Sequence, residues 1–274
     1  MKWIGPVIVI ILLLIFAVMI YRGQSPLKNI TNYRIYYGRV DDQTLEGMKD
    51  YDMVVVEALR FDAAMVERLH QAGVMVIGYI SVSEVGHWDD AILDVLGKSD
   101  FLYSDGKAVM NASNKLGDLK SIHYRTVLLN TIEKRIRSKG MDGIFFDTVD
   151  SIDVVDLEDK RLEQAYGYIK LIEDIRVKWE DAILIQNRGF RYTHLLERGM
   201  IDALLWENFS EDKMSEKVYQ RWAVNFRRMR WFKNIRPMVL SYRNEAESKA
   251  YADKNNWLFS YLPGQAGLMD WKLE

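Results

Sequence analysis

Two aspartates follow a short apolar run near the middle of the chain. The run is 144–146 (Ile-Phe-Phe), Asp147 comes directly after it, and Asp150 follows three residues later. A short, wholly apolar run suits a parallel strand that is covered on both faces. A carboxylate at the C-terminal end of such a strand lies where α/β barrels carry their chemistry. Either aspartate could instead cap the turn or helix that follows.

Most of the other apolar runs also end in polar side chains. The sequence predicts eight strands, at 33–37, 53–56, 74–80, 143–147, 183–185, 201–205, 238–240 and 257–259. The residues that close them are Tyr37, Glu57, Glu84, Asp147, Asn187, Glu207, Tyr242 and Tyr261. In a parallel barrel all of these positions open on one face, so we expect their side chains to converge.

Helical patterns fill most of the gaps between these strands. They cover about 42–50, 63–72, 121–139, 159–179, 192–198, 213–232 and 245–254. Strands alternating with helices over this length predict an α/β fold, specifically a (β/α)₈ TIM barrel. A doubly wound open sheet is the alternative, but the turn after the first strand, Gly38-Arg39-Val40, lacks the glycine-rich phosphate pattern that such sheets usually carry. The long excursion at 85–120 is predicted to be functional, because compact domains rarely contain loops of that length without a role.

The strand-end acids suggest acid–base chemistry. Four of the closing residues are acids, and no Arg or Lys stands among the closing residues. Crowded carboxylates raise the pKa of at least one member. A protonated acid beside an ionised one is what glycoside hydrolysis requires. A hard cation held by Asp147, Asp150 and Glu84 is the competing reading.

Composition narrows the functional classes. The 274-residue chain has no cysteine, which excludes disulfides, zinc–thiolate sites and thiol catalysis. Its formal net charge of -2 gives no basic field for nucleic acid. We see no phosphate-binding loop and no nucleophile elbow, and we expect no cofactor.

The N-terminus predicts a membrane anchor. Residues 4–20 are almost wholly apolar and uncharged, with Lys2 before them and Arg22 after them. We expect residues 1–22 to be an uncleaved signal anchor, 23–32 a linker and 33–274 the barrel, which would then work outside the membrane. A cleaved signal peptide is the alternative, but no small-residue cleavage pattern fits well.

Several of these segments together resemble glycoside hydrolase family 114, the endo-α-1,4-polygalactosaminidases. The matching segments are 36–38 (Tyr-Tyr-Gly), 51–57, 78–84, 140–150 (Gly-Met-Asp-Gly-Ile-Phe-Phe-Asp-Thr-Val-Asp), 186–187 (Gln-Asn) and 206–208 (Trp-Glu-Asn). They occur in the family's order over residues 33–262. The resemblance implies a barrel that cleaves α-1,4-linked galactosamine polymers of microbial exopolysaccharide.

The resemblance also implies residue roles. Asp147 would be the nucleophile or base and Glu207 the general acid. Tyr79, Glu84, Asp150 and Asn187 would contact the sugar, together with Tyr37, Glu57, Tyr242 and Tyr261 at the other strand ends. The partner would be a polysaccharide with cationic amino sugars, which an acidic cleft attracts. A non-catalytic polysaccharide-binding barrel and a hydrolase of another amino-sugar polymer are the alternatives, since a fold alone does not fix the activity.

Overall fold

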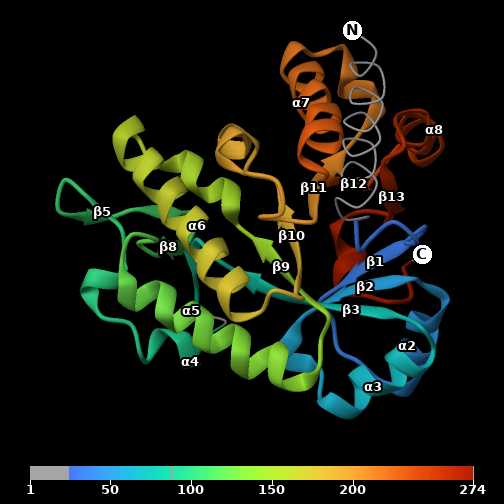
Figure 1. Ribbon diagram of the computed structural model, residues 1–274, viewed down its shortest axis with the longest axis horizontal. Helices are drawn as coiled ribbons and strands as arrows, with labels where there is room; N and C mark the ends of the chain where they lie inside the picture. Colours follow the sequence, from blue (N-terminus) through green and yellow to red (C-terminus); the bar gives the residue numbers. More distant parts are fainter. Residues whose placement is uncertain (1–24, 88, 274) are drawn as a thin grey trace, which may run out of the picture.

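The protein is an α/β barrel built on one eight-stranded parallel sheet. The computed structural model describes residues 25–87 and 89–273 (Figure 1). The strands, in sheet order, are β1 (Tyr33–Tyr36), β2 (Met53–Val56), β3 (Met75–Ser81), β9 (Gly143–Asp147), β10 (Ile183–Asn187), β11 (Ala203–Phe209), β12 (Arg236–Ser241) and β13 (Leu258–Tyr261). Every neighbouring pair in this sheet is parallel.

The sheet curls into a nearly closed barrel. The strands follow one another in sequence order without the reversal that marks a doubly wound sheet. β1 and β13, the two ends of the sheet, lie next to each other. The segment after β13 helps to cover this seam, because the backbone N–H of Tyr37 donates to the carbonyl of Leu268 at 2.6 Å. The predicted α/β barrel is confirmed at this level.

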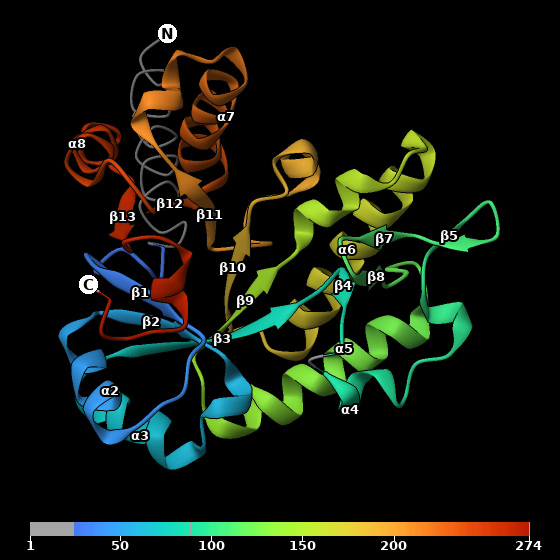
Figure 2. The ribbon, with the colours of Figure 1, turned by 180° about the vertical axis from the view of Figure 1, so that it is seen from behind.

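Helices cover the outside of the sheet (Figures 1 and 2). They are α2 (Asp42–Gly47), α3 (Ala63–Gln71), α4 (Asp90–Leu93), α5 (Ile122–Arg135), α6 (Glu158–Lys178), α7 (Lys217–Arg228) and α8 (Glu245–Asn255). The helix predicted at 192–198 is instead a 3₁₀ helix, Phe190–Leu195. The helix predicted at 213–232 is also divided: a 3₁₀ turn precedes α7, and a π-helical turn, Met229–Lys233, follows it.

Side chains alternate between two hydrophobic layers along each strand, as the pleat of a strand requires. The barrel interior contains Tyr33, Ile35, Met53, Val55, Ile77, Phe145, Ile185, Leu205 and Leu240. The layer under the helices contains Val54, Val56, Ile144, Phe146, Leu184, Leu204 and Val239. The next inward-facing positions, at the C-terminal ends of the strands, are Tyr37, Glu57, Tyr79, Asp147, Asn187, Glu207 and Tyr242.

The excursion after β3 is ordered and carries small strands of its own. β4 (Glu84–Val85), β8 (Asn114–Leu116) and β7 (Met110–Asn111) form an antiparallel sheet, and β5 (Tyr103–Ser104) pairs with β6 (Lys107–Ala108). Figure 1 shows this excursion reaching out to one side of the barrel.

The N-terminal boundary differs from the expected linker. Leu27 is fully buried and Ile30 is almost fully buried, and both join the interior hydrophobic cluster. Thr31 and Asn32 are tied to the carboxylate of Asp52, which accepts both backbone N–H groups. Residues 27–32 are therefore part of the packed domain. The predicted anchor at 1–22 lies outside the described residues, and within 25–87 and 89–273 no helix is long and apolar enough to cross a membrane.

Gly143 allows three strands to approach closely beneath Asp147. A Cβ at this position would lie 2.3 Å from the carbonyl oxygen of Ile183 and 2.8 Å from Cδ1 of Ile77.

Gly143→Ala should lower the free energy of unfolding by about 2 kcal/mol through overpacking, measured by urea denaturation. Gly97→Ala is the matched control, because its Cβ would meet nothing closer than 3.7 Å. Equal stabilities of the two variants would contradict this account.

Candidate active site

Two carboxylates are positioned by different strands of the barrel. Asp147 is the last residue of β9, and Glu207 lies near the end of β11. The pairing of β11 with β12 shifts register between Glu207 and Phe209, and the intervening Asn208 has a φ of 58°. A bulge of this kind re-aims side chains next to active sites, and asparagine tolerates the left-handed conformation.

Asn187 at the end of β10 joins the two acids. Its nitrogen Nδ2 donates to Asp147 Oδ1 at 2.8 Å and to Glu207 Oε2 at 2.7 Å. Two oxygens that share a donor cannot be further apart than the two bonds laid end to end, 2.8 Å plus 2.7 Å, or at most 5.5 Å. Asn187 is only 3% exposed, so the protein fixes this separation from within.

Tyrosines surround the pair. The hydroxyl of Tyr242 donates to Glu207 Oε1 at 2.6 Å. The hydroxyl of Tyr79 interacts with Asp147, and its ring packs on Tyr37 with ring centres 4.7 Å apart. Burial, followed by the nearby acids, raises the pKa of each of these three phenols, so all of them are neutral hydrogen-bond donors at neutral pH.

Asp147 is the acid whose proton affinity is most clearly changed. Burial and, second, the neighbouring charge of Glu207 raise the pKa of Asp147 to about 6, against the lowering effect of the Asn187 hydrogen bond. Desolvation and a like charge both disfavour the ionised carboxylate. A pKa among the strand-end acids is therefore raised as expected, but burial contributes more to the rise than the crowding of acids does.

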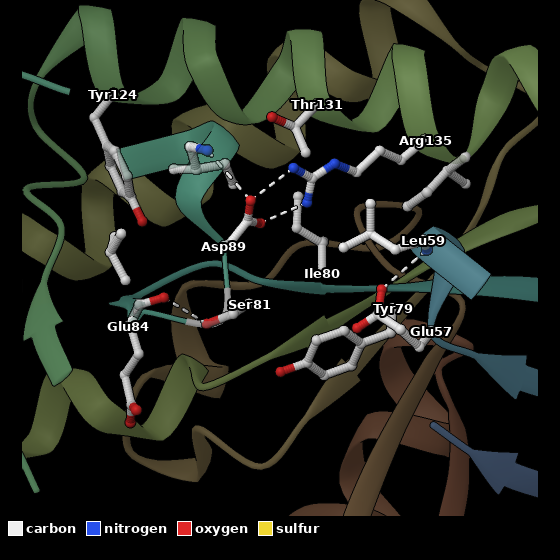
Figure 3. A pocket seen from close by; sticks show the side chains of 14 residues that line it. Glu57, Leu59, Tyr79, Ile80, Ser81, Glu84, Asp89, Tyr124, Thr131 and Arg135 are labelled. Carbon is white, nitrogen blue, oxygen red and sulfur yellow. Dashed lines mark hydrogen bonds and ion pairs between the residues drawn. The ribbon is translucent and has the colours of Figure 1, made fainter. Parts of the chain in front are cut away.

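Glu57 and Glu84 lie at either side of Tyr79, along the pocket between β3 and α5 (Figure 3). Glu57 caps the short 3₁₀ helix Ala58–Arg60 by accepting from the Leu59 N–H at 3.1 Å, and burial raises its pKa. Glu57 is therefore a helix cap, and its charge is close enough to Tyr79 to raise the pKa of that phenol.

Glu84 fastens the excursion to the barrel. Its two carboxylate oxygens accept from Asn111 Nδ2 and Asn114 Nδ2, each at 2.7 Å, and from the hydroxyl of Ser151. These partners come from β7, β8 and the segment after β9. Glu84 therefore holds three loops at the mouth of the barrel together, beside Asp147 rather than in contact with it.

Thr148 forms a second clasp directly after Asp147. Its φ of 62° is rare for a β-branched residue. The hydroxyl accepts from the backbone N–H groups of Ser83 and Glu84, at 3.0 and 3.3 Å, and shares a hydrogen bond of 2.9 Å with the Ser81 hydroxyl. Such strain concentrates at functional sites, where the surrounding structure must enforce it.

Asp150 is not a free acid of the cleft. It forms an ion pair with Arg188, whose Nε lies 3.2 Å from Asp150 Oδ2. Burial raises the pKa of Asp150 while the charge of Arg188 lowers it. No Arg or Lys is among the residues that close the strands, but Arg188, one residue after the strand end at Asn187, turns back with a φ of 54° and brings a cation to Asp150.

Tyr261 is not brought into this group. It pairs in register with Ser241, which faces the outer layer, whereas Leu258 and Leu262 face the interior. Alternation along β13 therefore directs Tyr261 away from the acids. Of the predicted site residues, Tyr37, Tyr79, Asp147, Asn187, Glu207 and Tyr242 converge, while Glu57, Glu84 and Asp150 border them.

Two of the histidines pair with aspartates outside the converging group. His70 Nε2 lies 2.9 Å from Asp142 Oδ2, and His123 Nδ1 lies 2.7 Å from Asp100 Oδ2. Both are ordinary structural pairings. Within the residues that the structure describes, no group of three or more His, Asp or Glu side chains is arranged to hold a metal ion.

Several residues of the site escaped sequence reasoning. Thr148, Ser151 and Arg188 sit beside predicted residues, but they were not singled out. Asn111 and Asn114 lie in the long excursion, which was predicted to be functional without a role for any single residue. Their pairing with Glu84 joins positions 27 and 30 residues apart, which no local pattern encodes.

The carboxylate of Glu84 can be tested as the fastening point of the excursion. Glu84→Gln would turn an amide N–H₂ toward donors that now meet an acceptor, which leaves a buried group unpaired. Residues 103–116 should then be cleaved at least about tenfold faster by trypsin at its Lys107 and Lys115 sites, at nearly unchanged global stability. Glu46→Gln, which alters an exposed carboxylate on α2, is the control. Parental proteolysis of the Glu84 variant would refute the role.

The fold is similar to that of solved glycoside hydrolases. The chain superimposes on the glycoside hydrolase domain of PelA from Pseudomonas aeruginosa with a TM-score of 0.70 and 19% identity, covering 85% of this chain and 94% of that one. It superimposes on Aspergillus fumigatus Ega3, solved in complex with galactosamine, with a TM-score of 0.58 and 16% identity, covering 88% and 94%. At these identities the likeness concerns the fold. No curated protein gives a significant match.

The family comparison is more specific. The model of glycoside-hydrolase family GH114 matches residues 23–253, which include every strand of the barrel but β13 and all of the converging residues. The resemblance drawn from the sequence is thereby confirmed. The chain belongs to glycoside-hydrolase family GH114, and it is a glycoside hydrolase.

Proposed function

We propose that this glycoside hydrolase cleaves α-1,4-linked galactosamine polymers with retention of anomeric configuration, using Asp147 and Glu207. The shared hydrogen bonds from Asn187 are the main support, because they hold the two carboxylates at a defined spacing inside the barrel mouth.

The spacing favours retention over inversion. Retaining glycosidases place their two carboxyl groups about 5–5.5 Å apart, whereas inverting enzymes need roughly 6.5–9.5 Å to admit a water. The facing oxygens of Asp147 and Glu207 are at most 5.5 Å apart. A separation within this limit suits a direct attack on the anomeric carbon and is shorter than the spacing that an inverting enzyme needs for its water.

The two steps follow from this geometry. Glu207, as the general acid, gives a proton to the glycosidic oxygen while the Asp147 carboxylate forms a bond to the anomeric carbon and the leaving sugar departs. Glu207 then acts as the general base and removes a proton from water, whose oxygen displaces Asp147 from the anomeric carbon, which regenerates both groups. The Tyr242 hydroxyl and the Asn187 amide hold Glu207 in place through both steps.

The substrate assignment is supported by charge. Asp147, Glu207 and the bordering Glu57 and Glu84 create a negative field at the barrel mouth. A galactosamine unit carries an amine that is cationic near neutral pH. The structural neighbour Ega3 was solved with galactosamine, which is consistent with this sugar as the unit recognised.

The direct test is cleavage of α-1,4-galactosamine polymer. The parent should release oligosaccharides whose new reducing ends appear first as the α-anomer by ¹H NMR. Asp147→Asn and Glu207→Gln should each lose at least about 10³-fold in kcat, because each removes a group that acts in the transition state. Arg228→Gln, on the outer helix α7, is the control for preparation effects.

Each alternative has its own signature. Polymer that is retained by the parent but never cut would indicate a non-catalytic binding barrel. Cutting by Asp147→Asn at the parental rate would remove Asp147 from the mechanism. First appearance of the β-anomer would show inversion and contradict the argument from spacing.

The pH dependence distinguishes the roles of the two acids. Because the pKa of Asp147 lies near 6, above its ordinary range, lowering the pH through about 6 protonates the nucleophile. The kcat/KM of the parent should therefore fall as the pH drops through this value, since kcat/KM reports the free enzyme. A profile that instead falls as the pH rises through about 6 would make Asp147 the acid and Glu207 the nucleophile.

A further inference from the structure

A groove extends from the acids toward helix α7. It is lined by Asp150 and Asp153 after β9, by Arg188 and Arg191 after β10, and by side chains of α7 that include Arg221 and Trp222. The groove begins beside the catalytic pair, because Arg188 directly follows Asn187 and forms an ion pair with Asp150, three residues after Asp147. Units of a polymer that lie next to those bound at the acids can therefore reach this groove.

The charge of the groove is opposite in sign to that of the barrel mouth. Arg188 pairs with Asp150 at 3.2 Å, and Arg191 pairs with Asp153 at 3.0 Å. These two pairs neutralise the carboxylates of the groove. The side chain of Arg221 is exposed, and its guanidinium makes no ion pair or hydrogen bond with residues 25–87 and 89–273, so it is the uncompensated charge of the groove.

The wall that presents Arg221 is rigid. The next residue, Trp222, packs on Phe190 with ring centres 4.9 Å apart and on Trp206 at 5.4 Å. Trp206 directly precedes Glu207 in β11 and is 2% exposed. The helix that carries Arg221 is therefore fixed to the strand that carries the catalytic Glu207 through a continuous aromatic contact.

We infer that this groove is a subsite for an N-acetylated amino sugar, with Arg221 as its specificity-determining residue. The inference rests on the proposed function. An unmodified galactosamine carries a cationic amine, which the guanidinium repels. An N-acetyl group is uncharged, and its carbonyl oxygen accepts from a guanidinium N–H. The enzyme thus favours cationic units at the acids and acetylated units beside Arg221.

The inference is tested with two polymers of equal length, one fully deacetylated and one about half N-acetylated. The parent should show a kcat/KM about tenfold higher for the half-acetylated polymer, the size of one charge-assisted hydrogen bond. Arg221→Glu should lose this preference and cut the deacetylated polymer at least as well as the parent does. Arg221→Lys, which keeps the charge, should retain part of the preference. Arg228→Glu makes the same charge change on α7 outside the groove and should leave both rates unchanged.

The outcomes separate the subsite from the activity itself. If the parent cuts both polymers equally, or if Arg221→Glu changes both rates by one factor, the subsite is refuted while the glycosidase stands. If the parent cuts neither polymer, the proposed function fails. Affinities of the parent and of Arg221→Glu for the two polymers, measured by calorimetry, then decide the subsite: a preference for acetylation that depends on Arg221 supports it, and equal affinities overturn it.

Discussion

The hydrogen bonds from one buried amide to two carboxylates are the constraint on which this site depends. Two acids at this distance repel each other, and burial makes the repulsion stronger. Asn187 offsets it by giving each acid one N–H. Because β10 lies between β9 and β11, the residue that closes β10 is the one that can reach both neighbours. The sheet order thus places the donor between the acids.

The rest of the architecture keeps that arrangement fixed from both sides. Thr148 and Glu84 clasp the excursion onto the end of β9, so the loop that borders Asp147 is tied to it by side chains rather than by backbone pairing alone. On the other side, Trp206 and Phe209 anchor β11 in the aromatic layer beneath α7 and α8. Asp147 and Glu207 therefore lie on two strands that are held in place by different contacts, and Asn187 on the strand between them links the two.

The sequence was sufficient to predict the barrel and most of the residues that converge at its mouth, because both follow from alternation. The apolar runs mark the strands, and the polar residues that end them mark the face on which these side chains meet, although Tyr261 points away from it. Local pattern could not predict partners distant in the chain, such as Asn111 with Glu84 or Leu27 with the barrel interior. It also failed where a backbone irregularity moves a side chain, as at Arg188 and in the 3₁₀ helix that replaces the expected helix after β10.

The bulge at Asn208 has a further consequence. Without it, Phe209 would share the inward direction of Leu205 and Glu207, since these positions are two residues apart. The extra residue resets the alternation, so Phe209 pairs with Ser241 and turns outward into the aromatic layer. The same strand therefore presents a carboxyl group to the barrel mouth at Glu207 and, two residues later, buries a phenyl ring in the hydrophobic layer under the helices. Straightening the bulge with Asn208 in place would turn the Phe209 ring into the barrel mouth beside Glu207, whereas deleting Asn208 would leave both side chains on their present sides, because adjacent strand residues face opposite ways.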